Sequence, residues 1–134
     1  MEVLVIPSRV LKEVVSTCKA SKTERVYIGV GSKKGSLYTV ENVIECPNIA
    51  EAPATRFIVD PLCMYHVFSD AEKRGLEVTA LIHNHPAPPL PSSEDQKGMV
   101  LWPIPWVIIS SSTGEYRAWI HVNGEVREVT IVEV

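Results

Sequence analysis

Residues 76–95 have the sequence LEVTALIHNHPAPPLPSSED, and three kinds of local structure follow one another along it. The first ten residues, 76–85, are apolar or β-branched for most of their length, which predicts a buried strand. The next ten, PAPPLPSSED, hold four of the ten prolines of the chain. Proline restricts the backbone and removes a hydrogen-bond donor, so we expect a stiff, irregular loop here. A short helix is predicted to follow, at about 93–101.

Three polar side chains of this strand–loop–helix unit are suited to bind a metal. His83 and His85 are two residues apart in the strand, so their side chains point to the same face. Asp95 would lie in the first turn of the helix and face them. Two imidazoles and one carboxylate leave one position of a tetrahedral zinc open, as a catalytic zinc requires. A plainer interpretation is also open, in which the histidines are packing residues and Ser92 and Asp95 only cap the helix.

The rest of the chain alternates predicted helices with predicted strands. Helices are expected over 8–20, with Ser8 as the cap, and over 61–74, which begins at a proline and is followed by a glycine. Strands are expected at 25–31, 37–45, 55–60 and 106–112, and Asn123-Gly124 predicts a hairpin between the last two strands. We therefore predict a single α/β domain, residues 1–134, in which a curved mixed β-sheet is flanked by helices.

Composition sets limits on the class of protein. A chain of 134 residues with 46% hydrophobic and 22% charged residues can bury a core of its own. The net charge of −3 argues against a nucleic-acid partner. No stretch has the features of a signal peptide or a membrane span, and we expect a cytoplasmic protein. The three cysteines, Cys18, Cys46 and Cys63, form no C-x-x-C pair, so we expect no disulfide and a reducing compartment.

The segment HNHPAPPLPSSED resembles the signature of the JAMM/MPN+ metalloproteases, H-x-H-x7-S-x-x-D with a glutamate upstream. The predicted elements occur in the order that this family shows, over most of the chain. The resemblance implies the MPN architecture, which is similar to that of cytidine deaminases. It also implies zinc ligands at His83, His85 and Asp95, an oxyanion-binding Ser92, and Glu24 as the general base.

One spacing departs from the family pattern. Six residues separate His85 from Ser92, where the family usually has seven. Matching Ser93 instead would restore the spacing but would place Gln96 at the aspartate position, and a neutral amide is a poor zinc ligand. Ser92 and Asp95 therefore remain the predicted pair, with Glu94 as the reserve ligand.

The resemblance also implies an activity. Members of the family hydrolyse amide or isopeptide bonds at the C-terminal tail of ubiquitin-like or sulfur-carrier proteins, and the segment 55–60 is a candidate edge for such a tail to extend. The chain is expected to be a monomer or a homodimer, with MEVLVI (1–6) and the tryptophan segment 102–106 as candidate interfaces. The alternatives are a non-catalytic MPN scaffold and a RadC-like protein. A zinc deaminase would need H-x-E and C-x-x-C, which are absent.

Overall fold

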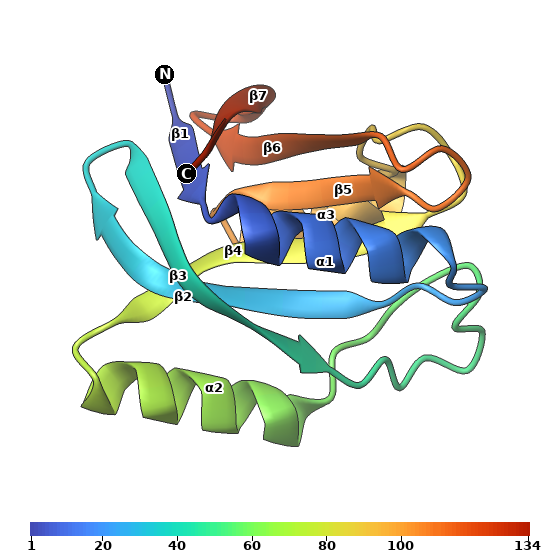
Figure 1. Ribbon diagram of the computed structural model, residues 1–134, viewed down its shortest axis with the longest axis horizontal. Coiled ribbons are helices and arrows are strands. Elements are labelled where there is room, and N and C mark those ends of the chain that lie inside the picture. The colour runs from blue at the N-terminus through green and yellow to red at the C-terminus, as the bar shows by residue number, and fades with distance from the viewer.

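The computed structural model describes residues 1–134 and contains seven strands and three helices (Figure 1). In chain order they are β1 (Val3–Ile6), α1 (Ser8–Lys19), β2 (Val26–Lys34), β3 (Leu37–Cys46), α2 (Pro61–Lys73), β4 (Glu77–His85), α3 (Ser93–Leu101), β5 (Trp106–Ser110), β6 (Tyr116–Val122) and β7 (Glu125–Glu133). The strand order is β1-β3-β2-β4-β5-β6-β7, and the sheet closes into a barrel because β1 pairs in parallel with both β3 and β7. The predicted α/β class, with a curved mixed sheet and flanking helices, is confirmed.

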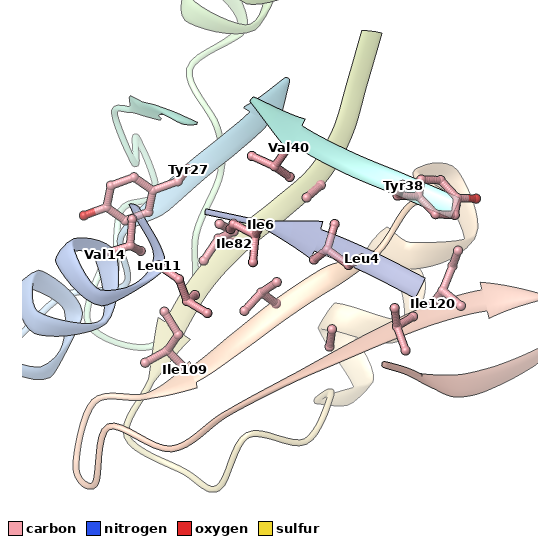
Figure 2. Packing of buried hydrophobic residues seen from close by; sticks show 14 of the residues in the cluster. Leu4, Ile6, Leu11, Val14, Tyr27, Tyr38, Val40, Ile82, Ile109 and Ile120 are labelled. Carbon is pink, nitrogen blue, oxygen red and sulfur yellow. The ribbon is translucent and has the colours of Figure 1, made fainter. Parts of the chain in front are cut away.

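Strand β4 is buried on both faces, which explains its nearly continuous apolar sequence. On one face Ile82 packs with Leu11 of α1 and Ile109 of β5 (Figure 2). On the other face Leu81 packs with Met64 of α2. Figure 1 shows α1 across β4 and β5, while α2 runs along the bottom of the molecule, past β2 and β3. The carboxyl end of β4 is therefore held between two packed layers.

The neighbours of β4 fix the position of its last residues. It pairs antiparallel with β2, where Val26 lies opposite His83, and parallel with β5, where Ser110 lies opposite His85. Helix α3 follows and packs on the start of β5. Gly98 permits this close approach, because a Cβ atom at that position would lie 2.6 Å from Cη2 of Trp106. The strand–loop–helix unit is thus anchored to the barrel at both ends.

The start of the chain differs from expectation. The segment predicted as an apolar interface forms β1 and closes the barrel, because its backbone pairs with β3 and β7. Ser8 is not the cap of α1: Pro7 occupies the N-cap position with no side-chain hydrogen bond, and Ser8 Oγ donates instead to Glu133 Oε1 at 3.0 Å. Both differences come from the return of β7 to the N-terminus, a contact between the two ends of the chain.

The segment 55–60 was expected to be a strand and is not one. Its only ladder contact is an isolated antiparallel bridge between Asn48 and Val59, and the preceding residues form turns. The alternating pattern instead places Phe57 inward while Arg56 stays exposed. The predicted strand is therefore wrong, and the docking of a substrate tail at 55–60 stays a prediction.

The cysteine prediction is also wrong. Cys46, at the end of β3, and Cys63, in the first turn of α2, form a disulfide with their Cα atoms 5.8 Å apart. They are 17 residues apart in sequence, and only the folding back of the segment 47–60 brings them together. Cys18 stays a free, buried thiol, and burial raises its pKa to about 11. None of the three helices is both long enough and apolar enough to cross a membrane.

Candidate metal centre

The two histidines meet at the carboxyl end of β4 as their spacing requires. His83 is fully buried and His85 nearly so, and their ring centroids are 5.6 Å apart. The Nδ1 atom of His85 lies 3.3 Å from the carbonyl oxygen of Ala87. When Nδ1 carries the proton and donates it to this carbonyl, the free lone pair is on Nε2. This tautomer is the one that a metal ligand coordinating through Nε2 needs.

Asp95 reaches the histidines from the first turn of α3. Its Oδ1 atom lies 3.2 Å from Nε2 of His83, and its Oδ2 atom lies 3.7 Å from Nε2 of His85. Ser92 caps the helix: its hydroxyl accepts from the Asp95 amide, and the Ser92 amide donates to Asp95 Oδ2, both at 3.0 Å. The helix cap and the clustering of the three predicted ligands are thus found together, because the cap orients the same carboxylate that faces the imidazoles.

The shortened proline loop still brings Asp95 to the histidines. The hydroxyl of Ser112 donates to the carbonyl of Pro86 at 3.0 Å, and the indole N–H of Trp119 donates to the carbonyl of Pro89 at 2.9 Å. Glu94, the reserve ligand, points to solvent, where it lies 3.7 Å from Arg56. Asp95, and not Glu94, is therefore the carboxylate that lies beside His83 and His85.

Several buried nitrogens in the cluster have no hydrogen-bond partner: Nδ1 and Nε2 of His83, and Nε2 of His85. An unsatisfied buried polar atom is costly, and a bound ion is one of the recognised explanations for it. No three His, Cys, Asp or Glu side chains already converge as a finished ion site. Two ligand atoms on one tetrahedral zinc are, however, about 3.3 Å apart. The donor types are those that zinc takes, and the 3.2 Å from Nε2 of His83 to Oδ1 of Asp95 is close to that value. The 3.7 Å from Nε2 of His85 is measured to the other carboxylate oxygen, Oδ2.

Glu24 approaches His83 from the other side. It is the second residue before β2, it is buried, and its Oε1 atom lies 3.6 Å from Nδ1 of His83, although the two residues are 59 positions apart in sequence. Burial acts to lower the pKa of His83, but the carboxylates of Asp95 and Glu24 outweigh it and raise that pKa to about 9. Burial acts to raise the pKa of Asp95, yet His83 and Ser92 hold it below its usual range. The carboxylates of Glu24 and Asp95 thus face opposite ring nitrogens of His83.

Sequence reasoning missed three residues around the cluster. The ring of Phe57 lies 4.7 Å from that of His83, and Trp106 meets the same imidazole edge-on at 5.9 Å, so two aromatic side chains shield it from water. Asn84 is buried between the two histidines. No sequence signal identifies Phe57 as a neighbour of His83, because the alternating pattern of its segment predicts a strand. Asn84 could have been found, because a polar residue in a strand buried on both faces needs a partner.

Two other histidines considered from the sequence lie apart from the cluster: His66 is exposed on α2, and His121 is half-buried on β6. Ser110 lies opposite His85 in the β4–β5 ladder, but its hydroxyl donates to the carbonyl of Pro86. The cluster thus consists of His83, His85 and Asp95, with Ser92 as the cap of the helix and Glu24 beside it.

A sequence profile of the prokaryotic homologs of the JAB domain matches residues 7–122 of this chain. The chain belongs to this family. The match covers every element from α1 to β6, and with them all five residues of the cluster. The resemblance to the JAMM/MPN+ family is confirmed at the level of the family.

Proteins with similar sequences or folds come from several organisms. The chain is 32% identical over 133 residues to a desampylase of Pyrococcus furiosus, covering 96% of this chain and 89% of the relative. It is 33% identical over 132 residues to a probable TtuB-protein conjugate cleaving protease of Thermus thermophilus, covering 97% and 82%. The fold matches a solved protein of Desulfitobacterium hafniense with a TM-score of 0.81 at 23% identity, covering 98% of this chain and 92% of that one. A JAB1/MPN domain protein of Archaeoglobus fulgidus matches with a TM-score of 0.60 at 21% identity, covering 99% and 100%.

Proposed function

We propose that this chain is a zinc-dependent hydrolase that cleaves the amide or isopeptide bond formed by the C-terminal tail of a ubiquitin-like or sulfur-carrier protein. The names of two relatives, desampylase and probable TtuB-protein conjugate cleaving protease, support this reaction class, and the chain matches both over nearly its whole length. One observation carries the proposal: unpartnered imidazole nitrogens face Asp95 in a buried place that Glu24 also reaches.

His83, His85 and Asp95 would hold the zinc, through the Nε2 atoms and the carboxylate. When bound, zinc in such a site lowers the pKa of water at its open position towards about 7 and polarises a carbonyl oxygen. The protein's own part is to keep the three ligands dry and aligned. Phe57 and Trp106 exclude water from His83, and the Ser92 cap holds the Asp95 carboxylate toward the imidazoles.

Glu24 and Ser92 supply proton transfer and charge stabilisation in this proposal. Glu24 accepts the proton of the attacking water and passes it to the departing amine, so that the amine leaves neutral. Ser92 Oγ accepts from the Asp95 amide, which leaves its own hydroxyl proton free to donate. That proton is directed to the oxyanion that develops as the water adds to the carbonyl.

The metal centre is tested by the zinc content of the purified protein and of His85→Ala and Asp95→Ala. About one zinc per chain in the wild type, and none in either variant, is the expected result. The wild type should also release the modifier from an isopeptide-linked conjugate of a ubiquitin-like protein. A wild-type protein that takes up no zinc after reconstitution would contradict the proposal and leave the non-catalytic scaffold as the conclusion.

Glu24 has a second candidate role, because its carboxylate lies on the Nδ1 side of His83. A carboxylate in that position can orient a metal-binding imidazole, and losing such a partner typically lowers metal affinity by about 10- to 100-fold. Glu24→Gln separates the two roles. We expect the variant to retain zinc at the wild-type affinity and to lose turnover, as a general base requires. A 10-fold or larger fall in zinc affinity would assign Glu24 to orientation of His83 instead.

A further inference from the structure

Asn84 lies between the two candidate zinc ligands but points away from them. Side chains alternate along a strand, so His83 and His85 face one side of β4 and Asn84 faces the other. Its side chain is almost fully buried, with 1% of the residue exposed. A buried amide must find hydrogen-bond partners, and those of Asn84 lie on a distant part of the chain.

The two partners of Asn84 flank Glu24. The Oδ1 atom of Asn84 accepts from the backbone N–H of Arg25 at 2.7 Å, and its Nδ2 atom donates to the carbonyl of Thr23 at 3.0 Å. The residues on either side of Glu24 are therefore bound to one side chain of the ligand strand. The backbone ladder between β2 and β4 ends at the pair Val26–His83. Asn84 thus continues the connection just where the ladder stops.

Glu24 itself is held from the opposite side by the segment 47–60. Its backbone N–H donates to the carbonyl of Pro53 at 2.7 Å, and its carbonyl accepts from Nδ2 of Asn48 at 2.8 Å. The Oδ1 atom of Asn48 accepts hydrogen bonds from the backbone N–H groups of Ala50 and Ile58, so the same side chain also stabilises the folded segment 47–60. Both backbone polar groups of Glu24 are satisfied, and the side chain is left free to face His83.

We infer that Asn84 is a positioning residue, which fixes the backbone of Thr23–Arg25 to the ligand strand and so sets the distance from the Glu24 carboxylate to the reacting water. The inference rests on the proposed function, in which Glu24 is the general base. A displacement of about 1 Å in a catalytic group can lower the rate by about 100-fold. Asn48 acts on the same backbone from the other side, so it provides an independent test.

The test compares Asn84→Ala with Thr79→Val, a matched control on the same strand. Thr79 is also buried, and its hydroxyl donates to the carbonyl of Thr39 at 2.8 Å, far from the cluster. We expect Asn84→Ala to lower kcat for conjugate cleavage by about 10- to 100-fold. Its KM should change by less than about 2-fold and its zinc content should stay at one per chain. Thr79→Val should leave kcat unchanged even though it lowers the unfolding temperature.

A double-mutant cycle shows whether Asn84 acts through Glu24. In the Glu24→Gln background, measured by single turnover at high enzyme concentration, Asn84→Ala should change the residual rate by less than about 2-fold. The visible spectrum of the cobalt-substituted protein should be the same for wild type and Asn84→Ala, because the ligands have not moved. An equal loss of rate in both backgrounds, or an altered cobalt spectrum, would overturn the inference.

Three further outcomes bear on the inference. If Asn84→Ala does not fold, Asn48→Ala replaces it, because that change leaves β4 intact. Asn48→Ala must then lower kcat by the same factor in the wild-type background and leave the residual rate of Glu24→Gln unchanged; otherwise the inference fails. Wild-type kcat in Asn84→Ala, beside an inactive Glu24→Gln, overturns the inference alone. A zinc-loaded wild type that cleaves no conjugate overturns the proposed function, and Asn84 then has no base to position.

Discussion

The ligand half of the site, His83, His85 and Asp95, comes from one continuous stretch of chain, whereas the base half, Glu24, is assembled from three separate segments. In the ligand half, two histidines share one strand face and the carboxylate sits in a capping box 10 residues further on. In the base half, Asn84 of β4 bonds to the residues on either side of Glu24, and Asn48 and Pro53 of the segment 47–60 bond to Glu24 itself. Local geometry defines the first half, and tertiary contacts define the second.

Because the two halves are built differently, mutations elsewhere in the chain should affect them to different extents. A strand buried on both faces and a capped helix are stiff, so the ligand half should bind metal whenever the barrel is folded. The base half depends on a turn-rich segment that is closed by a disulfide and has a single isolated bridge. Such a segment opens locally at lower free energy than the core. Turnover should therefore be more sensitive than zinc binding to changes outside the cluster.

The largest effect is expected from Asp95→Ala, which breaks the ligand half. The change removes a proposed zinc ligand, so zinc affinity should fall by more than the roughly 100-fold that is typical when a residue hydrogen-bonded to a ligand is lost. Turnover should fall to background. The loss of the capping bond lowers the free energy of unfolding of the metal-free protein by about 1 kcal/mol. Zinc titration and chemical denaturation measure the two effects separately.

Glu94→Ala is the control for this variant. Glu94 is adjacent in the same helix turn, but its side chain is 68% exposed and pairs only with Arg56. Zinc content and turnover should be those of the wild type. Loss of zinc in Glu94→Ala together with retention in Asp95→Ala would show that the reserve ligand is the real one.

The next largest effect is expected from breaking the disulfide that closes the base half. In the double variant Cys46→Ser/Cys63→Ser, the free energy of unfolding should fall by about 3 kcal/mol, the value expected for a closed loop of this length. Because Asn48 and Pro53 lie within the loop, kcat should fall while zinc content stays at one per chain. Reductant should have the same effect on the wild type and none on the double variant. A disulfide-free protein with full kcat would show that the base half does not depend on this closure.

The difference between local geometry and contacts of distant segments also decides which features the sequence could predict. The strand 76–85, the helix 93–101 and the spacing of His83, His85 and Asp95 follow from local periodicity, proline content and capping chemistry, and the structure has these elements in place. The hairpin at Asn123-Gly124 also follows from local sequence, because this residue pair favours a tight turn with positive φ. The structure confirms it: both residues have positive φ. The chemical roles of the five site residues stay predictions.

What the sequence could not predict depends on contacts between distant segments. Phe57 reaches His83 only because the segment 47–60 folds over the cluster, and the Cys46–Cys63 pair forms for the same reason. β1 was missed because four residues are too few to show a period, and its pairing with β3 and β7 is decided by barrel closure. Only the resemblance to the family predicts that Glu24 belongs to the site. Its distance from His83 in the sequence does not indicate that the two side chains meet.

A smaller effect is expected from Trp119→Phe, which loosens the proline loop of the ligand half. The change removes the indole donor to the carbonyl of Pro89 and should lower the free energy of unfolding by about 1 kcal/mol. Zinc affinity should fall by a few-fold, because the loop sets the path from His85 to Asp95. Isothermal titration against Thr79→Val, which also loses one side-chain donor, gives the comparison. Equal zinc affinity in both variants would mean that β4 and the helix cap alone hold the ligands in place.

The smallest effect is expected where α1, β6 and β7 meet, a place that belongs to neither half. Glu133 accepts from the Tyr116 hydroxyl at 2.7 Å and from Ser8 at 3.0 Å, and these bonds lower the pKa of the Glu133 carboxyl. A depressed carboxyl pKa stabilises the fold above its value in the unfolded chain, about 4.3, and the contribution is lost as the pH falls below that. Tyr116→Phe should therefore lower the free energy of unfolding by less than about 1 kcal/mol at pH 7. The difference from wild type should shrink as the pH falls through the lowered pKa of Glu133, and zinc content and kcat should not change. A change in kcat here would show that turnover responds to the whole barrel, and the distinction between the two halves of the site would then fail.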